Sequence, residues 1–216
     1  MIIIFVIINL THSGRTGFSM TENNQLTSDI SELVRQRRTI RSYATREVPD
    51  QLIKNLLQAS ADSVAAFPPE LACRFRLITS QEGKEKLASL IMGTYAEQKV
   101  YKWVPGKIQQ VMLDRIVKIP AFLAVILKKN GNSEQYDRSF AAICAMLQSF
   151  SLLSWEEKIG SVWTTDHFML KPSFRAGMDL EEDEDVVSML YLGYYEKIPR
   201  GKNRTPASKK LTFLQS

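Results

Sequence analysis

The sequence predicts an α+β fold in which a small sheet surrounds one long apolar helix. Three observations carry this prediction: short apolar strands alternate irregularly with longer helices, one helix is apolar on most of its sides, and no internal repeat is visible. The 216 residues, 44% of them hydrophobic, are enough to bury a substantial core. A single domain is therefore favoured over two.

Residues 1–24 are predicted to be an N-terminal extension, non-native or disordered, ahead of a domain that covers residues 25–216. The apolar run MIIIFVIINL is shorter than the roughly 20 residues that a membrane-spanning helix needs. No positive charge precedes this run, and the residues after it offer no A-x-A-like cleavage site for a secretory leader. Met20, which begins the polar stretch MTENNQLTSD, is a second candidate start. A leader and an added strand remain the alternatives.

Capping signals and apolar spacing predict two helices near the start of this domain. Ser28 or Asp29 can cap a helix that runs to about Arg37. Pro49 suits the first turn of a second, amphipathic helix that ends near Ser60. The segments predicted after it are a loop over 62–73, a strand over 75–79 and a helix over 80–98.

The second half of the chain contains the strongest helical pattern. Residues 137–155 have an apolar stripe flanked by further apolar residues, which indicates a central, nearly fully buried helix. The run PAFLAVILKK predicts a buried strand. The other predicted segments are a helix after Pro105, a short strand in IGSVWTT, a solvated acidic loop EEDED at 181–185, a last strand VVSMLYLGYY and an extended basic tail.

Composition excludes several classes of protein. The net charge of 28 − 23 = +5 is mildly basic, and no Lys/Arg-rich arm indicates nucleic-acid binding. The two cysteines, Cys73 and Cys144, have mostly apolar neighbours, which predicts free buried thiols in a reducing, cytoplasmic compartment. No C-x-x-C, H-E-x-x-H, G-x-S-x-G, Walker A or G-x-G-x-x-G motif is present, so neither a metal site nor a catalytic triad is predicted.

The stretch RQRRTIRSY is the first candidate binding segment. Its guanidinium, hydroxyl and backbone N–H groups are the donors that bind phosphate, and they belong to Arg37, Arg38, Thr39 and Arg41. Alternation in an extended segment puts Thr39 and Arg41 on the same side. A solvated charged face is the alternative that these residues alone favour. A nucleic-acid patch is a weaker alternative, because no stacking aromatic residues alternate with the basic ones.

Two further segments are candidates for the same site. A second basic cluster lies in the tail, at Lys202, Arg204, Lys209 and Lys210, and it either closes on the same phosphate or stays in solvent. In KIGSVWTT, the Gly160–Ser161 step lets the backbone approach a flat ligand, and Trp163 can form a wall beside it. The alternative is an ordinary helix C-terminus, with Gly160 near the cap and Trp163 in the core.

Taken together, these segments resemble the nitroreductase family of FMN-dependent oxidoreductases. RQRRTIRSYATREVPDQLIKNLLQAS is similar to the family's opening, a helix ending in R-R-S-x-R-x-[FY] followed by an amphipathic helix. AAICAMLQSFSLLSWEEKIGSVWTT is similar to its central helix and G-L-G-[ST]-x-W. DVVSMLYLGYYEKIPRGKNRTP is similar to its last strand and closing K-x-R tail. The resemblance covers about residues 28–210, in the family's order.

The resemblance implies a nitroreductase-like fold, with a mainly antiparallel sheet among helices, in an intertwined homodimer. FMN would lie at the interface, and the C-terminal segment would reach across to the partner. The residues that the resemblance places at FMN are Arg37, Arg38, Thr39 and Arg41 at the phosphate and ribityl chain, Lys202 and Arg204 at the phosphate, Gly160, Ser161, Trp163, Thr164 and Thr165 along the ring, and Ser63. It implies no catalytic side chain and no metal ligand.

The family's chemistry, carried over by this resemblance, is hydride transfer from NADH or NADPH to the flavin. The reduced flavin then passes electrons to a nitro compound, a quinone or a related small molecule. Two departures lie near the ring: the family's A-P-S-x-x-N-x-Q-P-W loop keeps only Ser63 here, and Lys158 replaces the first glycine of G-L-G. A flavin-binding protein with weak or no reductase activity is therefore the alternative, and a nucleic-acid-binding module is a third. Neither nucleic acid nor stable membrane insertion is expected.

Overall fold

The computed structural model describes residues 29–64, 71–97, 104–129 and 133–214. The chain divides into two compact units, residues 1–36 and residues 37–216. In the first unit, residues 29–36 form a helix, close to the predicted bounds. The predicted N-terminal extension lies outside the described residues.

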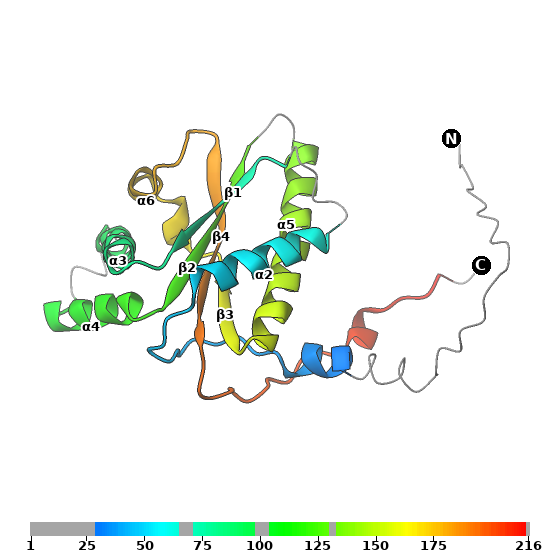
Figure 1. Ribbon diagram of the computed structural model, residues 1–216. Coiled ribbons are helices and arrows are strands. Elements are labelled where there is room, and N and C mark those ends of the chain that lie inside the picture. The colour runs from blue at the N-terminus through cyan, green and yellow to red at the C-terminus, as the bar shows by residue number, and fades with distance from the viewer. Residues whose placement is uncertain (1–28, 65–70, 98–103, 130–132, 215–216) are drawn as a thin grey trace. The chain divides into compact units, whose positions relative to one another are not determined.

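The second unit is built on a four-stranded sheet. Its strands are β1 (Cys73–Ile78), β2 (Ala121–Lys128), β3 (Ile159–Thr164) and β4 (Glu184–Tyr194). They lie in the order β1-β2-β4-β3, and every neighbouring pair is antiparallel (Figure 1). The predicted small antiparallel sheet is therefore confirmed, with β3 at one edge.

Helices cover both faces of this sheet. The helical elements are α2 (Asp50–Asp62), α3 (Gln81–Ala96), α4 (Gly106–Val117), α5 (Ser133–Glu156), α6 (Pro172–Gly177) and the 3-10 helices η2 (His167–Leu170) and η3 (Ala207–Lys210). Figure 1 shows α2 and α5 on one side of the sheet and α3 and α6 on the other. The sheet is thus the middle layer of three.

The position of strand β2 between two helical layers explains why its sequence is almost entirely apolar. Leu123 and Val125 pack into the core beneath α2 and α5, whereas Phe122, Ala124 and Ile126 pack into the core beneath α3 and α6. All three of the latter side chains are fully buried. A strand with a helical layer on each face cannot alternate between apolar and polar residues, which is the pattern that predicted it.

Helix α5 is less buried than its sequence predicted. One side, including Ile143, Met146 and Phe150, is fully buried against the sheet. At other positions around the helix, Phe140 is 38% exposed and Ala145 is also exposed. Within the described residues, the prediction of a nearly fully buried helix is therefore wrong, because apolar side chains of α5 reach the surface.

The acidic segment 181–185 departs in part from the predicted solvated loop. Residues 181–183 lie before the strand, with Glu181 and Glu182 exposed, but Glu184 begins β4 and is only 6% exposed. Its carboxylate receives two hydrogen bonds from the Arg74 guanidinium, each 2.6 Å long. One carboxylate oxygen of Asp185 forms an ion pair with Arg175, and the other lies 2.8 Å from Nζ of Lys129. The acidic residues are therefore tied to basic ones from β1, β2 and α6.

Candidate functional site

The basic segment after the first helix runs beside the edge strand β3. Thr39 and Ser161 form a parallel bridge, and the N–H of Ile40 donates to the carbonyl of Ser161 at 3.1 Å. Gly160 permits this approach, because a Cβ atom there would overlap the side chain of Ile40. We call residues 37–43 the arm. The bridge brings two of the three candidate segments together.

A cavity of about 350 Å³ lies where the arm, β3 and α5 meet. Its lining residues are Arg37, Thr39, Gln148, Ser151, Ser161, Trp163 and Thr165. Five of these seven were predicted as site residues from the sequence. Hydrogen-bonding side chains predominate, and Trp163, 36% exposed, adds a flat wall. Among the described residues, the lining includes a guanidinium and no carboxylate, so the cavity is suited to an anionic ligand with a planar part.

Arg37 is partly buried and lies near other positive charges. Burial lowers the pKa of the Arg37 guanidinium, and the positive charges of Arg204 and Arg38 lower it further. Among the described residues, no carboxylate forms an ion pair with Arg37, Arg41 or Arg204. A cluster of arginines without a carboxylate is the expected environment of a bound anion.

The C-terminal tail supplies part of this cluster. Arg204 lies close enough to Arg37 for its positive charge to lower the pKa of Arg37, although the two residues are 167 positions apart in the sequence. The tail also passes Arg38 at Gly201, where an added Cβ atom would lie 3.1 Å from Nη2 of Arg38. The sequence alone left open whether the two basic clusters meet. In the structure, the tail and the arm lie together.

Several predicted residues do not line the cavity. Ser63 instead bonds to Ser149 Oγ at 2.9 Å and to the carbonyl of Ser60. Thr164 donates to Asp166, and the Arg38 guanidinium donates to the carbonyl of Arg37. The others outside the lining are Arg41, Gly160, Lys202 and Arg204. A role for these residues in binding stays a prediction.

Two lining residues were missed by the sequence reasoning. Gln148 and Ser151 come from α5, one helical turn apart, and face the arm across the cavity. The Ser151 hydroxyl donates to the carbonyl of Leu147 at 2.8 Å, so its oxygen stays available as an acceptor. The sequence gives no signal that singles them out, because Ser149 and Ser154 also interrupt the apolar pattern of this helix.

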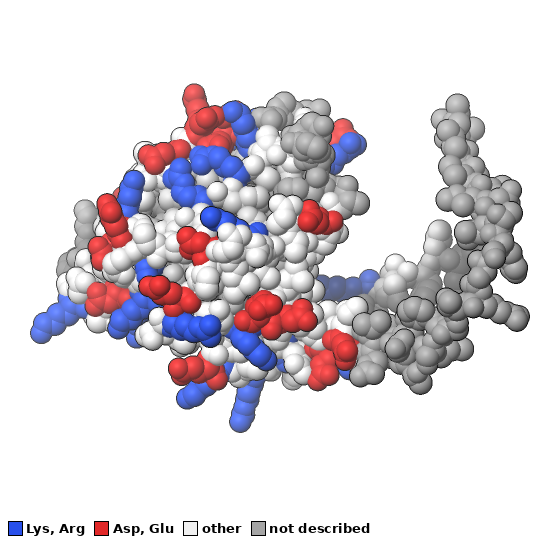
Figure 2. Space-filling view, viewed as in Figure 1, with Lys and Arg blue, Asp and Glu red and all other residues white. Residues whose placement is uncertain are grey.

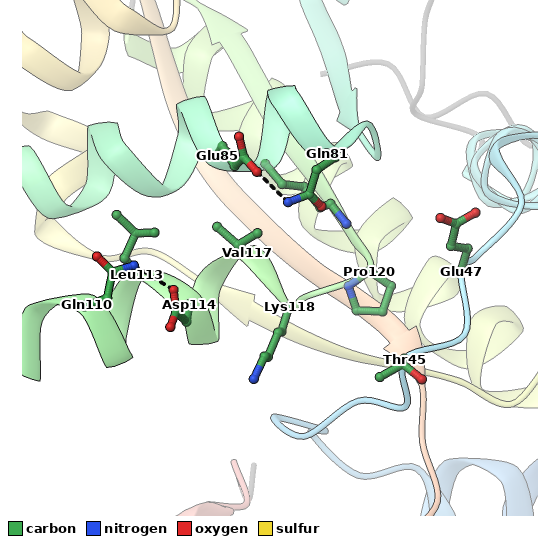
Figure 3. Close-up of a pocket in the computed structure, with 11 residues that line it drawn as sticks. Thr45, Glu47, Gln81, Glu85, Gln110, Leu113, Asp114, Val117, Lys118 and Pro120 are labelled. Carbon is green, nitrogen blue, oxygen red and sulfur yellow. Dashed lines mark hydrogen bonds between the residues drawn. The ribbon is translucent and has the colours of Figure 1, made fainter. Parts of the chain in front are cut away.

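A larger cleft of about 540 Å³ lies elsewhere, between α3, α4 and the segment before α2 (Figure 3). Its floor includes Leu113 and Val117. Two of its carboxylates already accept hydrogen bonds, from Gln81 to Glu85 at 2.6 Å and from Gln110 to Asp114 at 2.8 Å. The described lining residues are Thr45, Glu47, Gln81, Lys84, Glu85, Gln110, Leu113, Asp114, Val117, Lys118 and Pro120. None of the predicted site residues lines this cleft. The smaller cavity is therefore the candidate site.

Two proteins that are similar to this chain come from Bacillus species. The Bacillus subtilis (strain 168) protein YfhC, which carries the provisional name NAD(P)H nitroreductase, is 26% identical over 198 residues, which are 90% of this chain and 98% of that protein. A crystal structure of a nitroreductase-like family protein from Bacillus cereus has a TM-score of 0.77 at 25% identity, covering 94% of this chain and 100% of that one.

A more distant structure shares the fold. The FMN-dependent nitroreductase NfnB from Mycobacterium smegmatis, solved with NADPH, has a TM-score of 0.66 at 15% identity, covering 88% of this chain and 100% of that one. The model of the nitroreductase family matches residues 34–194, from within the first helix to the end of β4. The chain therefore belongs to the nitroreductase family and has its fold.

Proposed function

We propose that this chain passes electrons from NADH or NADPH, through FMN, to a nitroaromatic compound, a quinone or a similar small acceptor. Membership of the nitroreductase family makes the chain a flavin-dependent oxidoreductase. The choice of acceptor and the roles of individual residues are the parts proposed. The observation that carries the proposal is that Arg37 and Arg204, from opposite ends of the domain, come together beside a cavity whose described lining has no carboxylate.

The residues present fit FMN in their chemistry. Arg37, with Arg204 from the tail, would hold the phosphate through charge-assisted hydrogen bonds. Thr39, Gln148 and Ser161 supply hydroxyl and amide groups suited to the ribityl chain and the ring edges. When bound, FMN supplies the redox chemistry by accepting a hydride and releasing electrons to the acceptor. The chain's own part is to bind, orient and shield the cofactor, so no catalytic side chain is assigned.

The alternative is a flavin-binding protein with weak or no reductase activity. It is motivated by Ser63, the one position kept from the family's loop, which bonds to Ser149 and does not line the cavity. The rest of that loop, residues 65–70, lies outside the described residues. The proposal that the site binds FMN thus has stronger support than the proposal that an acceptor is reduced there.

An absorption spectrum and a reduction experiment separate these possibilities. We expect the purified protein to be yellow and to release flavin on denaturation. Mixing with NADH or NADPH in a stopped-flow instrument should bleach the flavin, and a nitroaromatic compound or a quinone should restore the colour. A protein that neither retains nor takes up FMN would contradict the proposal. Retention of FMN without bleaching would instead support the binding-protein alternative.

A second copy of the chain is part of the proposal. A homodimer would bury exposed apolar residues, which include Phe140 and Ala145 of α5 and Leu211 and Phe213 of the tail. A cavity of about 350 Å³ is at the small end of the range for ligand sites, which also fits a site completed by a partner. Light scattering of the purified protein should give the mass of a dimer.

Two other expectations concern partners and location. On the face shown in Figure 2, Lys and Arg side chains are interspersed with Asp and Glu, a mixture that does not favour a nucleic-acid surface. Within the ranges that the structure covers, no helix has the length and apolarity to cross a membrane. A cytoplasmic location is proposed from the free thiols of Cys73 and Cys144.

A further inference from the structure

The arm is held at two points, and the second of them is a tyrosine hydroxyl. At the first point, the N–H of Ile40 donates to Ser161 on β3 at 3.1 Å. At the second, Tyr43 Oη lies 2.8 Å from the carbonyl oxygen of Ile40 and 2.9 Å from that of Tyr191 on β4. The hydroxyl has one proton, so it donates to both carbonyls in a shared bond.

This arrangement fixes both peptide groups of one residue. The N–H of Ile40 is bound to β3 and its carbonyl is bound to Tyr43, while its side chain is buried at 2% exposure. Thr39 and Arg41 are the neighbours of Ile40 on either side. With the backbone fixed between them, the directions in which these two side chains leave the arm are fixed as well.

The ring of Tyr43 is also seated firmly. A Cβ atom at Gly193 would lie 2.8 Å from Cδ1 of Tyr43 and 2.8 Å from Cγ of Pro120, so the tyrosine packs closely on the glycine backbone. The next N–H, that of Ala44, donates to the carbonyl of Tyr194 at 2.8 Å. Burial raises the pKa of Tyr43 above its usual range, which keeps the hydroxyl protonated and able to donate.

We infer that the Tyr43 hydroxyl is a positioning group for the anion end of the site: by clamping the Ile40 carbonyl to β4, it aims the donors of the arm at the phosphate of the bound cofactor. Tyr43 is not among the residues that line the cavity, so its effect passes through the backbone. The inference rests on the proposed function, in which that anion is the FMN phosphate.

The test compares FMN with riboflavin, which has the same ring and ribityl chain but no phosphate. Tyr43→Phe keeps the ring packed on Gly193 and removes only the hydroxyl. We expect the dissociation constant of FMN to rise roughly three- to tenfold, as for loss of one buried hydrogen bond, and that of riboflavin to stay within about twofold. Both constants are measured by fluorescence quenching of the flavin on the full-length protein.

A matched control removes another buried hydroxyl. Thr94 on α3 is 1% exposed, and its hydroxyl donates to the carbonyl of Ile91 at 2.7 Å. Thr94→Val should lower thermal stability in the same way as Tyr43→Phe but leave the affinities for FMN and riboflavin unchanged. A purely structural role for Tyr43 would predict that the two variants behave alike in binding.

Hydrogen exchange followed by mass spectrometry gives a second readout that does not depend on affinity. In Tyr43→Phe, the amides of residues 38–44 should exchange faster while those of β2 stay protected. Equal loss of FMN and riboflavin, no loss of either, or unchanged exchange in the arm would each overturn the inference. If the wild-type protein binds FMN no better than riboflavin, the phosphate site itself is wrong, and the proposed function fails separately.

Discussion

At the scale of the residue, two arginines of the arm are the main donors of the proposed phosphate site. Arg37 lines the cavity and Arg41 follows the bridge to β3, and neither forms an ion pair within the described residues. The double variant Arg37→Ala/Arg41→Ala should lose FMN affinity, with each lost charge-assisted bond costing on the order of 1.5–3 kcal/mol. Isothermal titration with FMN measures this, and Arg115→Ala on the exposed side of α4 is the control. Unchanged affinity in the double variant would show that the residue assignment is wrong.

A second prediction at this scale concerns Lys158, which replaces a glycine of the family's pattern. Lys158 follows α5 with φ = 61°, in the left-handed region where a Cβ atom is unfavourable. Lys158→Gly should therefore raise the free energy of unfolding by about 1 kcal/mol. Urea denaturation measures the change. Lys158→Ala keeps the Cβ atom and should bring no such gain; if both variants gained equally, side-chain charge rather than backbone conformation would be the cause.

The residues of the cavity also show how far the sequence could predict the site. Arg37, Thr39 and Ser161 were predicted because each belongs to a short motif with its own chemical meaning, and all three line the cavity. Gln148 and Ser151 were not, since which side of α5 faces the arm depends on how the helix packs on the sheet. Periodicity fixes the apolar side of a helix but not the neighbour of its polar positions.

At the scale of the element, β4 begins with an ion pair that predicts how stability depends on pH. The Arg74 guanidinium lowers the pKa of Glu184 to about 2, against an ordinary value of 4.5. The stabilisation is therefore fully present above pH 4.5 and is lost as the pH falls through about 2. When the free energy of unfolding is measured between pH 6 and pH 2, it should decrease within this window as the pH is lowered. Glu184→Gln should flatten that part of the curve.

The control for this pH dependence is a carboxylate on the surface. Glu134 pairs with Arg138 within α5, and both side chains are more than two-thirds exposed (70% and 78%). Surface pairs of this kind contribute little, so Glu134→Gln should leave the acid limb of the curve unchanged. A curve for Glu184→Gln identical to that of the wild type would show that other groups control acid unfolding.

The ion pair between Arg74 and Glu184 shows why the start of β4 was not predicted from the sequence, whereas β2 was. The strand β2 is apolar on both faces, and its sequence shows this directly as seven consecutive apolar residues, 121–127. The burial of Glu184 depends on Arg74, which is 110 positions away and reaches it only across the sheet. A local pattern can predict the first case, whereas the second requires the order of the strands.

At the scale of the whole molecule, the exposed apolar residues of α5 predict an interface between two copies. Phe140 is 38% exposed, and Ala145 of the same helix is exposed as well. Phe140→Asp should shift the protein toward the monomer in light scattering and lower its retention of FMN, because a charge would be buried without a partner. Phe140→Leu, which stays apolar, is the matched variant and should remain dimeric. Dimer retention in Phe140→Asp would place the interface elsewhere.

The C-terminal tail connects the cofactor site with assembly, and two truncations can separate these roles. Removing residues 199–216 deletes Lys202 and Arg204, whereas removing residues 211–216 keeps both and deletes the exposed apolar end with Phe213. Because Arg204 lies near Arg37, only the longer truncation should weaken FMN directly, by an amount comparable to one charge-assisted bond, on the order of 1.5–3 kcal/mol.

The shorter truncation tests the reach of the tail toward a partner. If Leu211 and Phe213 pack against a second copy, their loss should weaken the dimer in light scattering while FMN affinity, measured at a concentration where the dimer persists, is unchanged. Equal FMN affinity in the longer truncation and the wild type would remove Arg204 from the site. The arm would then have to hold the phosphate through Arg37 and Arg41 alone, and the double variant of these two residues would lose FMN completely.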